Sequence, residues 1–164
     1  MQDYLKKQKE VSGAVIAVGG SILLYGSKAD GSDWNVAVQN PRGQDGEAMG
    51  VLSLSGTTNV STSGDYEKYF MQDGKRYHHI LDPSTGYPAD SGLISVTIVS
   101  DDGTLADGLS TSLFIMGEEK AAQFWKENSE KFETIMETAD GKLYVTEGIA
   151  DSLTTDMDVT VIHK

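Results

Sequence analysis

Two of the six Asp-Gly pairs, Asp73-Gly74 and Asp140-Gly141, most restrict the folds that this chain can adopt, because strand-like segments flank them. Asp-Gly suits a type I′ turn, because both central residues of that turn have positive φ, and the turn joins adjacent antiparallel strands. Segments with strand-like patterns flank both pairs: Tyr66–Gln72 with Lys75–Leu81, and Phe132–Met136 with Lys142–Thr146. The chain is therefore expected to contain a hairpin with a type I′ turn at Asp73-Gly74 and another antiparallel hairpin at Asp140-Gly141.

Other segments extend this pattern to a complete domain. Short apolar or alternating runs predict strands at Ala14–Val18, Ser21–Tyr25, Trp34–Gln39, Ala48–Leu54, Asn59–Ser63, Leu93–Ser100 and Met157–Ile162. The continuous apolar run Ala14–Val18 predicts a buried strand. Helical patterns occur at Asp3–Val11, Thr104–Met116 and Glu118–Lys131. We expect Thr104 to cap the second helix and Gly117 to end it. Early strands followed by late helices predict one α+β domain over residues 1–164, with a mainly antiparallel sheet and helices on one side.

Composition narrows the classes of partner. A formal net charge of −12 repels nucleic-acid phosphates and anionic lipid headgroups, so neither is an expected partner. A bound dinucleotide would feel the same repulsion, so a phosphate site here needs a cation or a locally basic loop. The absence of cysteine excludes disulfides and thiolate metal sites. The first residues, MQDYLKKQKEVSG, lack the apolar core of a targeting signal.

The first candidate site is the segment YHHILDPSTG that follows the first hairpin. Alternation along a strand places His78 and His79 on opposite faces, so one is expected to pack and the other to face a cleft. A histidine can accept a proton near neutral pH. Asp82 and Thr85 can cap the turn, and Gly86 allows the backbone to approach a ligand. Taken alone, these residues fit a structural turn better than a site.

A second candidate lies on the predicted helix Thr104–Met116. Asp107 and Thr111 are four residues apart, so they share one helix face and offer the oxygen ligands that Mg²⁺ prefers. By pattern alone, a capping aspartate and a threonine bonded to its own helix are the better interpretation. The hydroxyl-rich segment Ser61–Asp65, with Gly19-Gly20, is a third and weaker candidate.

Four blocks in order nevertheless resemble one family, the FAD:protein FMN transferases, also called the thiamine biosynthesis lipoprotein family. The blocks are AVIAVGGSI, STSGDYEKYF with GKRYHHILDPSTGYP, LADGLSTSLFIMG, and ETIMETADGKLYVTEGI. They cover nearly the whole chain and match the C-terminal half of the family. The resemblance implies an α+β fold related to the tunnelling fold.

The resemblance also implies a reaction. FAD is the substrate, its FMN moiety is transferred to a threonine hydroxyl of an acceptor flavoprotein, AMP leaves, and Mg²⁺ stabilises the pyrophosphate. Asp107 and Thr111 match the metal ligands, and His79 matches the residue that helps deprotonate the acceptor. The positions expected to contact FAD are Leu81, Asp82, Thr85, Gly86, Gly19 and Gly20.

The chain departs from the family in length and at two positions. Members carry a further N-terminal half that forms much of the FAD pocket, so we expect exposed apolar surface here and dimerisation or strand exchange that covers it. Gly108 replaces a usual alanine, and Ser84 replaces a usual basic residue that contacts phosphate. Full-length members are extracytoplasmic and membrane-anchored. The alternatives to transfer are a non-catalytic flavin-binding or interaction module and an FAD pyrophosphatase.

Overall fold

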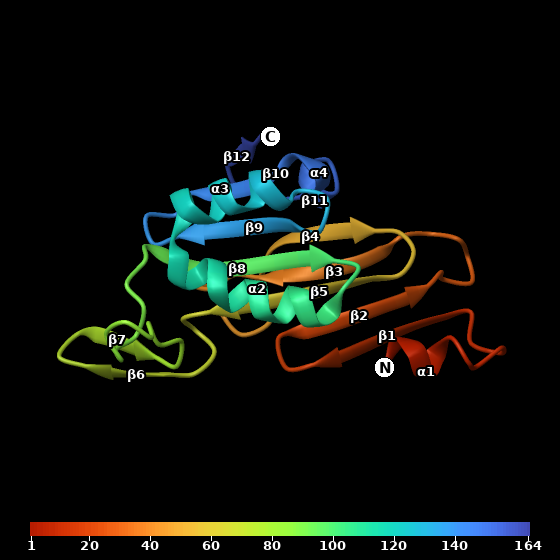
Figure 1. Cartoon of the computed structure of the whole chain (residues 1–164), viewed down its shortest axis with the longest axis horizontal. Helices are drawn as coiled ribbons and strands as arrows, with labels where there is room; N and C mark the ends of the chain where they lie inside the picture. Colours follow the sequence, from red (N-terminus) through yellow and green to blue (C-terminus); the bar gives the residue numbers. More distant parts are fainter.

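A seven-stranded sheet in the order β1-β2-β5-β8-β9-β10-β12 forms the centre of the computed structural model, which describes all 164 residues (Figure 1). Its strands are β1 (Gly13–Val18), β2 (Ser21–Gly26), β5 (Thr58–Gly64), β8 (Leu93–Ser100), β9 (Glu133–Thr138), β10 (Leu143–Thr146) and β12 (Val159–Ile162). Every neighbouring pair is antiparallel except β10 with β12. The prediction of a mainly antiparallel α+β fold is confirmed.

Two different layers cover the two faces of this sheet. The helices are α1 (Gln2–Leu5), α2 (Gly103–Met116), α3 (Glu118–Asn128) and α4 (Glu147–Ala150), and the long ones, α2 and α3, lie on one face (Figure 1). A second sheet, in the order β11-β4-β3, packs on the other face and contains β3 (Trp34–Gln39), β4 (Ala48–Leu54) and β11 (Leu153–Thr154).

Strand alternation divides the core between these layers. Ile98 on β8 belongs to the cluster beneath the helices, together with the fully buried Phe114 and Trp125. Its neighbour Val99 belongs to the cluster beneath the second sheet, and that cluster also contains the fully buried Leu52. Because successive strand residues point to opposite faces, β8 and β9 contribute side chains to both cores.

The hairpin predicted around Asp73-Gly74 forms a separate two-stranded sheet that projects from one end of the molecule (Figure 1). Its strands are β6 (Tyr69–Gln72) and β7 (Lys75–His78). Asp73 has φ of 51° and Gly74 has φ of 76°, as a type I′ turn requires. All four residues of β6 are exposed, so the hairpin contributes little to either core.

The first strand and the first helix differ from the sequence-based expectations. The helix expected at Asp3–Val11 is only α1, Gln2–Leu5. The strand expected to be buried, β1, lies at the edge of the central sheet, and Val15 and Val18 are 52% and 72% exposed. A continuous apolar run does not distinguish an edge strand from a central one, because it carries no information about neighbours.

The predicted cap of α2 is also wrong. The side chain of Asp102, not that of Thr104, accepts hydrogen bonds from the backbone N–H groups of Thr104 and Leu105. The helix does end at Gly117, which has φ of 82°.

None of the helices combines the length and the apolar composition that crossing a membrane requires.

Candidate functional site

The two predicted metal ligands lie where α2 packs against β5. Both Asp107 and Thr111 are exposed and share the side of the helix that meets this strand. The Oδ1 atom of Asp107 accepts hydrogen bonds from Ser21 Oγ at 3.2 Å and from Ser61 Oγ at 3.4 Å. Thr111 Oγ1 lies 2.9 Å from Ser63 Oγ. One carboxylate and a row of hydroxyls from three elements therefore lie along the contact between α2 and β5, in two hydrogen-bonded groups.

This oxygen cluster, defined here as Ser21, Ser61, Ser63, Asp107 and Thr111, fits a hard divalent cation. All of its donors are oxygen atoms, and Mg²⁺ is commonly held by one or two carboxylates with substrate phosphates completing the shell. No group of three or more histidine, cysteine, aspartate or glutamate side chains is placed to hold a metal. The oxygen cluster offers the type of donor that Mg²⁺ prefers, and metal binding by Asp107 and Thr111 stays a prediction.

Gly19 and Gly20 form the tight turn that brings Ser21 to this cluster. Gly19 has φ of 58°, which glycine adopts without strain. A Cβ on Gly20 would lie 2.5 Å from the backbone oxygen of Thr62, and the N–H of Thr62 donates to the oxygen of Gly20 at 2.9 Å. The two glycines thus have a clear structural role beside the oxygen cluster, and their contact with FAD stays a prediction.

The loop after β7 separates the two histidines as the alternation predicted. His78 is buried, its Nε2 lies 3.1 Å from the backbone oxygen of Ala89, and its ring meets Phe114 of α2 edge-on at 5.5 Å. Its Nδ1 has no hydrogen-bond partner. His79 is exposed. His78 therefore anchors the loop, His79 faces solvent, and a catalytic role for His79 stays a prediction.

The remaining predicted residues line the exposed side of this loop. Leu81, Thr85 and Gly86 are exposed, and Asp82 is half-buried. Asp82 Oδ1 accepts from the backbone N–H of Ser84 at 2.8 Å and from its hydroxyl at 2.7 Å, and these bonds hold the pKa of Asp82 below its usual value. Gly86, at φ of 73°, donates its N–H to the backbone oxygen of Asp82. The expected turn chemistry is confirmed.

Helix α2 connects the oxygen cluster to the histidine loop. Thr111 belongs to the cluster and Phe114 contacts His78, so roughly 5 Å of helix separates the two contacts. The hydroxyl of Ser91 also donates to the backbone oxygen of Phe114. No hydrogen bond joins the predicted residues of the oxygen cluster to those of the histidine loop. Both groups contact α2, but they do not contact each other through hydrogen bonds.

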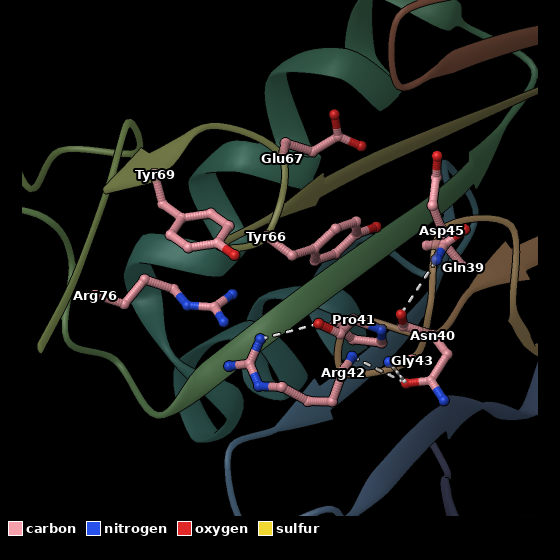
Figure 2. A pocket seen from close by; sticks show the side chains of 10 residues that line it. All are labelled: Gln39, Asn40, Pro41, Arg42, Gly43, Asp45, Tyr66, Glu67, Tyr69 and Arg76. Atoms are coloured by element: carbon pink, nitrogen blue, oxygen red, sulfur yellow. Dashed lines mark hydrogen bonds between the residues drawn. The ribbon is translucent and has the colours of Figure 1, made fainter. Parts of the chain in front are cut away.

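Sequence reasoning missed a third feature, an arginine-lined cavity of about 580 Å³ (Figure 2). Arg42 and Arg76 enter it from opposite sides, and the rings of Tyr66 and Tyr69 lie beside them. Arg42 donates from both terminal nitrogens to the two carboxylate oxygens of Asp65 at 2.7 Å, which raises the pKa of Arg42. Arg76 lies 3.5 Å from the same carboxylate.

These two arginines are the only ones in the chain, which is the signal that could have drawn attention to them. The guanidinium of Arg76 also lies 4.1 Å from the ring centroid of Tyr69, within the range of a cation–π contact. A smaller cavity of about 220 Å³ shares both arginines and is also lined by His78. The ion-pair network therefore ties the β3–β4 loop to the base of the hairpin that carries the histidines.

Comparison with known proteins gives these features a family context. A model of the ApbE family matches residues 1–136. A Vibrio cholerae protein named FAD:protein FMN transferase is 38% identical over 139 residues, which are 85% of this chain and 41% of that protein. A Klebsiella pneumoniae protein of the same name is 42% identical over 120 residues, 73% of this chain and 35% of that protein.

Solved structures agree with the sequence comparisons. The ApbE protein from Thermotoga maritima matches with a TM-score of 0.76 and 37% identity, over 85% of this chain and 44% of that one. The flavin transferase ApbE from Vibrio cholerae matches with a TM-score of 0.73 and 34% identity, over 92% and 47%. The chain thus spans less than half the length of these relatives. With the family model covering most of its residues, the chain belongs to the ApbE family.

Proposed function

We propose that this chain carries the metal-binding and acceptor-activating part of an FAD:protein FMN transferase. The observation that carries the proposal is the oxygen cluster, in which Asp107 and Thr111 meet three serine hydroxyls from β2 and β5. Relatives named FAD:protein FMN transferase align over most of the chain, which supports FAD as the substrate. We infer Mg²⁺ as the cofactor from the all-oxygen donor set.

Asp107 is the residue on which the metal depends. It supplies the only carboxylate of the oxygen cluster, while the hydroxyls of Ser21 and Ser61 fix its orientation. When bound, Mg²⁺ supplies positive charge that offsets the pyrophosphate of FAD and the net charge of −12 on this chain. Transfer of a phosphoryl group depends mainly on positioning and on this charge neutralisation.

We propose that His79 acts on the acceptor. Its exposed ring can take the proton of a threonine hydroxyl as that oxygen bonds to the FMN phosphorus. The bond from this phosphorus to the bridging oxygen breaks, and AMP leaves with that oxygen. Leu81, Asp82, Thr85 and Gly86 lie on the exposed side of the same loop, where we propose that they contact FAD.

The test is covalent flavinylation of a threonine-containing acceptor protein by this polypeptide with FAD and Mg²⁺. The product is read by in-gel flavin fluorescence and by a mass increase equal to one FMN less one water. Asp107→Asn should lower the rate at fixed Mg²⁺ by roughly a hundredfold or more and raise the Mg²⁺ concentration needed. His79→Ala should lower it by roughly 10²–10⁴.

Matched controls separate these roles from general damage. Asp101→Asn and His163→Ala change exposed residues outside the proposed site and should transfer FMN at the unaltered rate. Release of free FMN and AMP without transfer would instead indicate an FAD pyrophosphatase. FAD binding without turnover would indicate a flavin-binding module. A location outside the cytoplasm on a membrane anchor, and self-association, remain proposals from the family resemblance.

A further inference from the structure

The β6–β7 hairpin presents one outer face whose composition is fixed by its register. Phe70 pairs with Tyr77, and Gln72 pairs with Lys75. The ladder continues one step inward, because the N–H of His79 donates to the backbone oxygen of Lys68 at 3.0 Å. Alternation then places six side chains on one face: Lys68, Phe70, Gln72, Lys75, Tyr77 and His79. We call these residues the outer hairpin face.

The opposite face of the hairpin is the one that holds it to the protein. His78, on that face, is buried against Phe114 and Ala89. Arg76 reaches Asp65 and stacks on Tyr69. An isolated two-stranded hairpin is marginal in water, so these contacts are what support its shape. The opposite face therefore holds the hairpin in place, while five of the six side chains of the outer hairpin face are exposed and Tyr77 is partly exposed.

The centre of the outer hairpin face is an aromatic platform. The rings of Phe70 and Tyr77 stack at a centroid distance of 5.1 Å with 6° between their planes. Phe70 is 59% exposed. Lys75 Nζ lies 5.8 Å from the ring centroid of Tyr77, so a cation borders the platform. Exposed aromatic side chains of this kind are enriched at protein-binding sites.

Charge identifies the kind of partner. The chain has 25 acidic and 13 basic residues, yet the outer hairpin face contains two lysines and no carboxylate. A face of this kind attracts an acidic segment and sets its direction, while the rest of the surface repels such a segment. His79, the proposed acceptor-activating residue, lies at the inner end of the same face.

We propose that the outer hairpin face docks the acceptor protein, and specifically an acidic, extended segment that carries the threonine to be modified. This inference rests on the proposed FMN transfer. The strand rise places Phe70 and Tyr77 roughly 7 Å from His79 along the face, and Lys75 roughly 13 Å from it. A docked segment therefore has an apolar side chain about two residues from its threonine and a carboxylate about four to six residues from it.

The test is an NMR titration of the isotope-labelled 164-residue chain with a synthetic peptide. The peptide has a central threonine, a leucine about two residues away and aspartates about four and six residues away. A matched peptide has lysines in place of the aspartates. The proposal requires that the acidic peptide shift backbone signals of residues 68–79 and bind more tightly than its lysine counterpart.

Variants with matched controls identify the contributing side chains. Phe70→Ala should weaken peptide binding roughly tenfold or more, as loss of a central aromatic anchor does. Lys75→Glu should weaken binding several-fold at low salt and less at high salt. The controls are Val15→Ala, an exposed apolar residue matched to Phe70, and Lys126→Glu, an exposed lysine matched to Lys75. Both positions lie outside the hairpin, so both variants should bind the peptide as the wild type does.

Three results would overturn the docking proposal: signal shifts located elsewhere, equal binding by Phe70→Ala and Val15→Ala, or no binding of either peptide at millimolar concentration. Dimerisation through the hairpin, seen by light scattering, would also overturn it in favour of a second copy. Failure of the proposed function is distinguishable. If wild-type protein binds the peptide at the hairpin but transfers no FMN, the docking surface stands and the transfer assignment fails.

Discussion

Replacing Asp65 with asparagine removes the carboxylate at the centre of the two-arginine network. The Asp65 side chain is 11% exposed and accepts two hydrogen bonds of 2.7 Å from Arg42, with Arg76 at 3.5 Å. Charge-assisted bonds of this kind contribute about 1.5–3 kcal/mol each in protected sites. Asparagine keeps one acceptor oxygen, and Arg42 is 42% exposed and can recover water. We therefore expect a loss of about 2 kcal/mol in the free energy of unfolding.

The assay is urea unfolding followed by far-UV circular dichroism, with a thermal melt as a second measurement. For a chain of this size, a loss of about 2 kcal/mol lowers Tm by roughly 4–8 °C. The control is Asp140→Asn, which breaks the ion pair of 2.8 Å with Lys142 in which both side chains are about 60% exposed. Because both charges are solvated, that change should lower Tm much less than Asp65→Asn does.

A double-mutant cycle isolates the ion pair from other effects. Arg42→Met alone should destabilise the protein, and its effect should largely disappear when Asp65 is already asparagine. The reasoning is refuted if Asp65→Asn costs no more than Asp140→Asn, or if the effects of Asp65→Asn and Arg42→Met simply add. Either result would mean that the contact seen in the structure contributes little to holding the hairpin base.

Two further predictions concern a buried carboxyl and a crowded glycine. Burial raises the pKa of Glu137 above its usual value of 4.5, so the folded state holds this proton more tightly than the unfolded state and loses stability as pH rises above 4.5. Glu137→Gln should therefore raise Tm at pH 8 and have little effect near pH 4. The control Glu130→Gln, at an exposed position, should have little effect at either pH. Gly20→Ala should cost about 1–3 kcal/mol in urea unfolding, because its Cβ would lie 2.5 Å from the backbone oxygen of Thr62. The control is Gly108→Ala in the interior of α2, where a Cβ would meet open space, and this change should stabilise the protein by about 0.5–1 kcal/mol. Equal effects of the two glycine substitutions on stability would contradict the packing argument.

Local chemistry allowed much of the fold to be predicted. Asp73 and Gly74 specify their turn through backbone conformation alone, and the hairpin forms where they predict it. The short elements α4 and β11 were not predicted, because four and two residues carry no readable periodicity. The exposure of β1 depends on which strands lie next to it, and that information is not local.

The candidate site was only partly predictable for the same reason. The spacing of Asp107 and Thr111 shows that they share a helix face, but Ser21 lies 86 residues from Asp107 in the chain. Only the packing of α2 against the sheet brings these oxygens together. The contact between Arg42 and Asp65 likewise depends on the tertiary arrangement of the β3–β4 loop and the end of β5.

The most direct test of the account is whether a divalent ion binds at the oxygen cluster. Mn²⁺ replaces Mg²⁺ at oxygen sites and broadens NMR signals of nearby nuclei, so it reports even weak binding by the 164-residue chain. We predict broadening centred on Ser21, Ser63, Asp107 and Thr111, competition by Mg²⁺, and loss of the effect in Asp107→Asn but not in Asp101→Asn. Broadening centred elsewhere, or unchanged in Asp107→Asn, would contradict the assignment of this cluster as the metal site of an FMN transferase.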